Sequence, residues 1–291
     1  AREHMRAYAP CVPFNFGSLR MACADVVKII VIAIIEGITE WLPVSSTGHI
    51  IIFERFFALS DNFSNDFKQL FDYVIQLGAI LSVPILFNDK LFALKKRKKQ
   101  TLELWVKVVI ASIPAVAAIA LDNLFESFGE KIQSYIIASA LIFYGIVFVV
   151  LEKVYADVPS KRISVRDITY CDSLKIGGFQ ALAAIPGTSR SGITIIGGRI
   201  CGVSRQAATE FSFYLAIPAI AGASGYKTIK FALSGATVTL QQVSALLLGF
   251  TVSFAVSVFV IKLLTNFVKT HGFTGFGVYR ILLGVALFII L

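Results

Sequence analysis

Six long apolar segments, separated by short charged loops, constrain this chain more than any other feature of its sequence. A helix needs about 20 mostly apolar residues to cross a bilayer, with about 17 as the short limit. The segments that approach or meet this length are Asp72–Phe87, Trp105–Leu124, Gln133–Leu151, Thr209–Gly225, Val243–Leu264 and Gly275–Leu291. Hydrophobic residues make up 56% of the chain and charged residues 15%, too few to give a compact soluble domain its polar surface. We therefore expect an all-α integral membrane protein with six transmembrane helices.

The first 20 residues do not share this pattern. They mix arginine, proline, glycine and aromatic residues without periodicity, so we interpret residues 1–20 as an expression-derived or disordered leader. Residues 21–291 then form a single membrane domain. The formal net charge of +9 is clustered in loops between apolar runs, which is the pattern of a membrane protein and not of a nucleic-acid partner.

Two further apolar regions are interrupted by polar turns. Val26–Phe57 is interrupted by Glu36, Glu40 and the stretch Ser45-Ser-Thr-Gly-His49, and Leu174–Cys201 by Pro186-Gly-Thr-Ser-Arg-Ser-Gly192. The pattern predicts that each region forms two short half-helices joined by a turn. Non-helical backbone at membrane depth is tolerated only where protein buries it or where it lines a wet cavity. We therefore interpret both regions as re-entrant helix hairpins.

The charges of the loops predict how the helices are oriented. The loops after the first and third spans are basic, and the loop between the second and third is acidic. The basic residues are Lys90, Lys95, Lys96, Arg97, Lys98 and Lys99 in one loop and Lys153, Lys161, Arg162, Arg166 and Lys175 in the other, and the acidic ones are Asp122, Glu126 and Glu130. The positive-inside rule places both basic loops in the cytoplasm. The first hairpin then enters from outside, and the second enters from the cytoplasm.

An internal repeat agrees with this orientation. Leu42–His49 can be laid over Ile185–Gly192 without gaps, and Asp72 with its apolar run over Glu210 with its own. Repeat one would cover about residues 24–152 and repeat two about 174–291. Three spans follow each hairpin, and because three is odd, the second repeat must be inverted. Inverted-topology repeats with broken helices are typical of transporters, so a lipid-phosphate flippase or an ion-coupled transporter is an alternative to an enzyme.

Glu36 and Glu40 lie inside the first interrupted region and share one helix face, because they are four residues apart. Intramembrane carboxylates are costly and usually functional. Two carboxylates that leave room for water and a substrate phosphate suit a divalent cation, Mg²⁺ or Ca²⁺. A structural alternative is a pair of glutamates that is solvated or salt-bridged.

The two turns supply the other reactive groups. In the first, Ser45, Ser46 and Thr47 offer hydroxyls that can attack phosphorus, and His49 can serve as their base, although such turns are often only helix caps. In the second, Arg190 has the fork geometry for phosphate, or it pairs with a carboxylate to hold helices together. Small residues around it would let amide groups face an anion.

Together, Glu36-Gly-Ile-Thr-Glu-Trp-Leu-Pro-Val-Ser-Ser-Thr-Gly-His49 and Pro186-Gly-Thr-Ser-Arg-Ser-Gly192 resemble the motifs of the undecaprenyl-diphosphate phosphatase family of bacteria, the bacitracin-resistance type. Val74–Ala79 and Gly202–Phe213 are also similar to that family, and the resemblance runs from about Ala24 to the C-terminus. It implies a hydrolase of the bacterial cytoplasmic membrane with its site open to the outer face. The substrate would be a polyprenyl diphosphate lipid, whose monophosphate carries cell-wall precursors for peptidoglycan synthesis.

The resemblance also implies roles for residues of this chain. The candidate catalytic residues are Glu36, Glu40, Ser46, His49 and Arg190, with a divalent cation on the two glutamates, and the candidate substrate contacts are Ser45, Thr47, Ser189, Ser191 and Thr194. We expect Ser46 to be the nucleophile, with His49 or Glu40 as its base. Attack by His49 itself and attack by metal-bound water remain open. Membrane lipid is the expected surrounding, and a homodimer is one option for assembly.

Overall fold

The computed structural model describes residues 23–60, 63–117, 124–125, 127–156, 158–233 and 238–291. The proposed leader, Asp61, Asp122 and Glu126 lie outside these residues. The described chain is helical, and its only β feature is an isolated bridge between Arg162 and Val203. In chain order, the helices are α1 (Cys23–Thr39), α2 (Ser46–Phe57), α3 (Asn65–Leu86), α4 (Asn88–Leu91), α5 (Leu94–Ala117), α7 (Glu130–Val154), η2 (Val165–Asp167), α8 (Tyr170–Ala181), η3 (Leu182–Ala184), α9 (Arg190–Ile200), α10 (Arg205–Leu233), α11 (Leu240–Phe267) and α12 (Thr274–Ile290).

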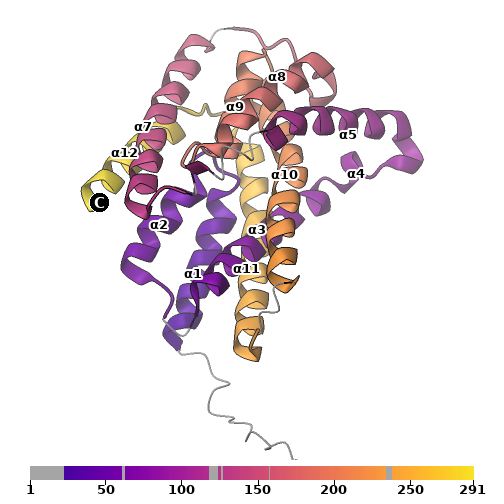
Figure 1. Cartoon of the computed structure of the whole chain (residues 1–291). Coiled ribbons are helices and arrows are strands. Elements are labelled where there is room, and N and C mark those ends of the chain that lie inside the picture. Colours follow the sequence, from indigo (N-terminus) through magenta and orange to yellow (C-terminus); the bar gives the residue numbers. More distant parts are fainter. Residues whose placement is uncertain (1–22, 61–62, 118–123, 126, 157, 234–237) are drawn as a thin grey trace, which may run out of the picture.

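Both interrupted regions form pairs of short helices, as predicted. The first pair is α1 and α2, and the second is α8 and α9 with η3 between them. Figure 1 shows the first pair in the lower half of the molecule and the second pair in the upper half, with the two turns meeting between them. The two hairpins therefore approach from opposite ends, as an inverted repeat requires.

Among the described helices, α3, α7 and α11 are long and apolar enough to cross a membrane, and α12 is a shorter apolar helix. The predicted spans starting at Trp105 and Thr209 correspond to α5 and α10, which begin 11 and four residues earlier, at Leu94 and Arg205. These helices include charged residues that a search for apolar runs leaves out. The all-helical membrane class is thus confirmed, whereas the count of six spans stays a prediction.

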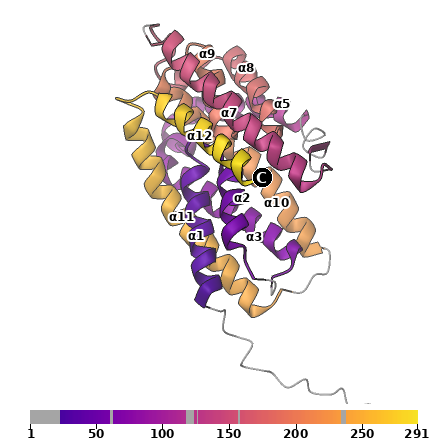
Figure 2. The same ribbon diagram turned by 90° about the vertical axis from the view of Figure 1, so that its left-hand side faces the viewer.

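The packing of helices follows an internal two-fold relation. Helix α1 lies along α11 and α8 lies along α5, while α3 packs on α10 and α7 on α12. Figure 2 shows α7 beside α12 and α1 beside α11. A Cβ added to Gly145 would lie 2.8 Å from the carbonyl oxygen of Gly277, and one added to Gly277 would lie 2.7 Å from that of Gly145. The glycines therefore let the backbones of α7 and α12 approach closely, as small residues do between membrane helices.

The structure corrects the register of the repeat by one residue. Ser45 and Ser189 are the only described residues other than glycine with a positive φ, at 74° and 69°, and each immediately precedes a half-helix. Matching the two residues that share this conformation pairs Ser45 with Ser189, whereas the gapless sequence alignment pairs Ser45 with Thr188. The gapless alignment places Pro43 opposite Pro186. The serine with positive φ, however, lies two residues after Pro43 in the first turn and three residues after Pro186 in the second, so aligning the prolines shifts the register by one residue.

The segments that carry the predicted cytoplasmic charges gather at one end of the molecule. The Lys107 ammonium of α5 donates to the backbone carbonyl of Arg166 at 3.0 Å. Arg205, at the start of α10, pairs with Glu152 near the end of α7 at 2.6 Å. This common end is what the predicted topology requires, since both basic loops must lie on one side of the membrane.

Candidate active site

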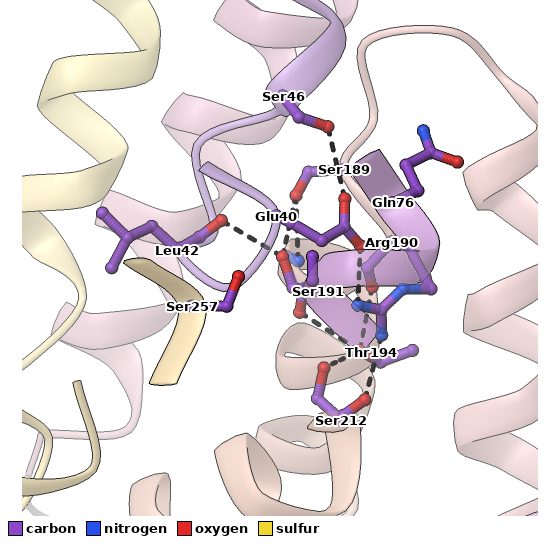
Figure 3. Close-up of polar contacts among 12 residues, drawn as sticks. Glu40, Leu42, Ser46, Gln76, Ser189, Arg190, Ser191, Thr194, Ser212 and Ser257 are labelled. Atoms are coloured by element: carbon purple, nitrogen blue, oxygen red, sulfur yellow. Dashed lines mark hydrogen bonds and ion pairs between the residues drawn. The ribbon is translucent and has the colours of Figure 1, made fainter. Parts of the chain in front are cut away.

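The two turns meet in an ion pair between Glu40 and Arg190. Nη2 of Arg190 lies 3.0 Å from Oε1 of Glu40, and Nη1 donates to the backbone carbonyl of Ser212 on α10 at 2.9 Å. Only 12% of each side chain is exposed. Figure 3 shows Arg190 between these two partners. The tertiary fold thus joins the glutamate motif to the arginine motif, and the alternative of a structural ion pair is present in this state of the molecule.

Ser46 completes this contact. Its hydroxyl donates to Oε2 of Glu40 at 3.3 Å, so the two oxygens of one carboxylate receive Arg190 and Ser46 (Figure 3). Ser46 and Arg190 are the first residues of α2 and α9, and the first amide groups of a helix have no partner within it. Two helix N-termini from the two repeats therefore converge on Glu40, an arrangement that suits an anionic group.

The two N-termini differ in how they are capped. The Ser189 hydroxyl accepts a hydrogen bond from the Gly192 amide at 3.2 Å, whereas the Ser45 side chain makes no such bond to α2. Positive φ at both serines is a strained conformation for a residue other than glycine and costs of order 1–3 kcal/mol. Residues in such conformations concentrate at functional sites, because the surrounding structure must hold them.

The remaining polar residues of the arginine motif bond within the protein. The Ser191 hydroxyl donates to the Leu42 carbonyl at 3.1 Å and thereby links the two turns. The Thr194 hydroxyl lies 2.8 Å from the Arg190 carbonyl and 2.7 Å from the Ser212 hydroxyl, and it is almost fully buried. Ser191 and Thr194 therefore support the position of Arg190. A contact between either hydroxyl and substrate would require these bonds to open. In the first turn, the Thr47 side chain is exposed.

Glu36 is fully buried, and neither of its carboxylate oxygens has a hydrogen-bond partner among the residues that the structure describes. Burying an unpaired carboxylate is costly, so this position calls for a proton or a cation. Among the described residues there is no cluster of three or more histidine, cysteine or acidic side chains. Mg²⁺, however, often uses only one or two carboxylates together with water and substrate phosphate. Glu36 could serve as such a carboxylate ligand of Mg²⁺. It fits this role better than Glu40, whose two oxygens already contact Arg190 and Ser46.

His49 is held away from Ser46. Its Nδ1 lies 2.7 Å from the Ser45 carbonyl, and its Nε2 lies 2.7 Å from the hydroxyl of Tyr279, on which the ring also stacks. A carbonyl can only accept, so Nδ1 carries a proton, and both ring nitrogens have partners other than Ser46. The carboxylate of Glu40 is therefore the basic group in contact with the Ser46 hydroxyl in this structure.

Arg280 of α12 is a part of the site that the sequence analysis missed. It is fully buried, and its guanidinium donates to the carbonyls of Pro43, Gly187 and Thr188 at 3.2, 3.0 and 3.0 Å. One side chain therefore holds both turns at once. The signal was available, because an arginine inside an apolar segment satisfies the same criterion that singled out Arg190.

Replacing Arg280 with methionine is expected to destabilise the protein and to lower turnover per folded molecule. The change leaves three buried carbonyl oxygens without a donor, and each unsatisfied group costs about 1–3 kcal/mol. Thermal unfolding in detergent measures the first effect, and activity normalised to folded protein measures the second. Arg199→Met is the matched control, since Arg199 is also buried and bonds the Val203 and Tyr155 carbonyls away from the turns. Equal loss of turnover in both variants would contradict a positioning role for Arg280.

Comparison with known proteins places the chain in a family. The model of the family described as bacitracin resistance protein BacA matches residues 29–286. The chain belongs to the bacitracin resistance protein family. A relative named undecaprenyl-diphosphatase from Streptococcus gordonii is 46% identical over 91% of this chain and 95% of its own length. Relatives with the same name from Enterococcus faecalis and Lachnoclostridium phytofermentans are 44% and 46% identical, over 91% and 89% of this chain and 97% and 94% of their own lengths.

Membership of the bacitracin resistance family agrees with the resemblance seen in the motifs. The matched range includes both turns and all five candidate catalytic residues. It also includes Tyr279 and Arg280 of α12. The whole arrangement described above therefore lies within the part of the chain that the family shares.

Proposed function

We propose that this protein hydrolyses undecaprenyl diphosphate to undecaprenyl phosphate and inorganic phosphate. The names of the relatives supply the substrate. The observation that carries the proposal is the convergence of Ser46 and Arg190, the first residues of two half-helices, on Glu40. A diphosphate needs positive charge and amide donors, and this junction offers both. Undecaprenyl phosphate produced in this way returns to peptidoglycan synthesis, and its supply underlies resistance to bacitracin.

The proposed mechanism uses Ser46 as the nucleophile. Its oxygen forms a bond to the terminal phosphorus while the bond from that phosphorus to the bridging oxygen breaks, which releases undecaprenyl phosphate. The hydroxyl proton passes to Glu40. Arg190 exchanges its contact with Glu40 for the transferring phosphoryl group and stabilises the charge there. Water then attacks the phosphorus of the phosphoserine, the bond from phosphorus to the Ser46 oxygen breaks, and Glu40 returns its proton to that oxygen as inorganic phosphate leaves. In the two alternative mechanisms, His49 or a water molecule attacks the terminal phosphorus in place of Ser46.

The proposal includes a divalent cation, Mg²⁺ or Ca²⁺, at Glu36 with Glu40 nearby. When bound, such an ion neutralises charge on phosphate oxygens. The unpaired, buried carboxylate of Glu36 supports this assignment.

Phosphate release in detergent micelles tests the proposed activity. Purified protein with undecaprenyl diphosphate is expected to liberate inorganic phosphate and to stop when a chelator is added. A flippase or an ion-coupled transporter would release none, because its work requires two compartments. Full activity in excess chelator would remove the cation from the mechanism while leaving the hydrolase in place.

We further propose six transmembrane helices and two re-entrant hairpins in the bacterial cytoplasmic membrane, with the site open to the outer face. Single cysteines near Arg97 and Arg162 are expected to react with an impermeant reagent only after the cytoplasm is opened, and cysteines near Asp61 and Glu126 are expected to react in intact cells. The gathering of the basic segments at one end supports this orientation. The reverse labelling pattern would turn the site toward the cytoplasm.

A further inference from the structure

A cavity of about 110 Å³ lies at the end of the molecule where α4, α5, η2 and α10 meet. The residues that matter for its chemistry are Lys90, Arg97, Thr101, Arg166, Glu210 and Tyr214. The cavity is separate from the candidate active site. The side chains of Glu210 and Tyr214 of α10 line it, whereas the hydroxyl of Ser212 between them bonds the Thr194 hydroxyl of the candidate site. Residues two apart on a helix point in different directions, so α10 stands between the two places.

The charges of this cavity are unequally paired. The carboxylate of Glu210 receives the Lys90 ammonium at 2.8 and 2.9 Å and the Tyr214 hydroxyl at 2.6 Å. Both oxygens of the Glu210 carboxylate therefore already have partners within the protein. The guanidinium groups of Arg97 and Arg166 have no ion pair or hydrogen bond within the described part of the chain, and Asp89 is the only other acidic residue in the lining. The cavity thus presents two arginine side chains to a ligand.

The shape of α5 brings one of these arginines to the cavity. Arg97 has non-helical backbone angles, φ −142° and ψ 44°, so the helix is broken there. Beyond the break, α5 exposes the apolar side chains Leu102, Val106, Val109 and Ile113, while Leu104 lines the cavity. An exposed apolar stripe on a membrane protein is a surface for lipid chains. Leu104 is two residues from both Leu102 and Val106, so this stripe faces away from the cavity, and the cavity itself offers a ligand its charged groups.

We propose that this cavity binds a phosphate group, either that of an anionic phospholipid or free inorganic phosphate. Arginine is suited to phosphate because its planar fork donates two parallel hydrogen bonds. Basic pockets between membrane helices on the cytoplasmic side bind anionic lipid head groups. Inorganic phosphate offers the same oxygens to the arginines, and the experiment below separates the two sources. The site does not depend on the proposed hydrolase activity, and its test needs no turnover.

Native mass spectrometry of the detergent-purified protein tests the proposal. Dioleoyl phosphatidylglycerol is titrated against dioleoyl phosphatidylcholine, and inorganic phosphate is titrated in a separate arm. The wild-type protein is expected to retain one phosphatidylglycerol in preference to phosphatidylcholine. The double variant Arg97→Gln/Arg166→Gln is expected to bind it about 25-fold more weakly, the product of the roughly fivefold that each basic residue contributes near anionic lipid.

The matched control is Lys98→Gln/Lys99→Gln. It also removes two positive charges, both from the basic run that contains Arg97, but neither lysine lines the cavity, so the affinity should change much less. Melting curves of all three proteins show whether each is folded. Equal weakening in both double variants would overturn the site in favour of general attraction to the basic end. Unchanged lipid binding in the arginine variant would also overturn it, and competition by millimolar inorganic phosphate alone would identify a free anion as the ligand.

Discussion

The Ser46→Ala protein is expected to bind undecaprenyl diphosphate but to release no phosphate above background. The serine oxygen is the atom proposed to attack phosphorus, and its hydroxyl is in contact with the carboxylate of Glu40 at 3.3 Å. A serine hydroxyl is a weak nucleophile until a base removes its proton, so alanine removes the reaction and leaves the binding groups in place. Phosphate release at saturating substrate measures the first effect, and equilibrium binding of a non-hydrolysable diphosphate measures the second.

Ser139→Ala is the control for this substitution. Ser139 is exposed on α7 and bonds only the carbonyl of Tyr135 in its own helix, so turnover should be unchanged. Acid-stable phosphoserine trapped in the wild-type protein would support Ser46. Acid-labile phosphate on the protein would instead indicate His49 as the nucleophile. Appreciable turnover by Ser46→Ala would exclude Ser46 and favour His49 or water. His49→Ala is expected to slow turnover by about 10²–10⁴ if the ring is an acid or base.

Arg190→Lys is expected to reduce kcat by about 10²–10³, the range seen when one charge-stabilising donor is removed. The guanidinium contacts Glu40 and the Ser212 carbonyl with two different nitrogens. An ammonium group keeps the charge but has one nitrogen, and it cannot present a fork to phosphate. Steady-state kinetics in detergent, with folded protein quantified by its melting transition, measure the effect.

Arg162→Lys is the matched control for Arg190. Arg162 also pairs with a carboxylate, that of Asp172 at 3.0 Å, but it lies in the loop before α8, away from the turns. Its replacement should leave kcat near that of the wild-type protein. If Arg190→Lys behaved in the same way, the pair of Arg190 and Glu40 would be a structural ion pair, and phosphate binding would have to be assigned to other groups.

Much of the architecture could be predicted from local features. Apolar length predicted α3, α7 and α11, and the polar interruptions predicted where α1 and α8 end. These signals are strong because lipid allows irregular backbone only where protein or water can satisfy it. The lengths of α5 and α10 were underestimated, since their charged ends carry no apolar signal. The register of the repeat was wrong by one residue, because backbone conformation and not proline spacing relates the two turns.

By itself, the sequence determined the membrane class, the two broken hairpins and the residue types of the site, because each depends on composition or spacing along one short segment. Only the tertiary structure decided which of these groups touch. It paired Glu40 with Arg190 and Ser46, turned His49 toward Tyr279, and placed Arg280 across both turns. Apart from the contact between Ser46 and Glu40, which lie in one segment, these contacts join residues far apart in the chain. Spacing within a segment carries no information about the distance between segments.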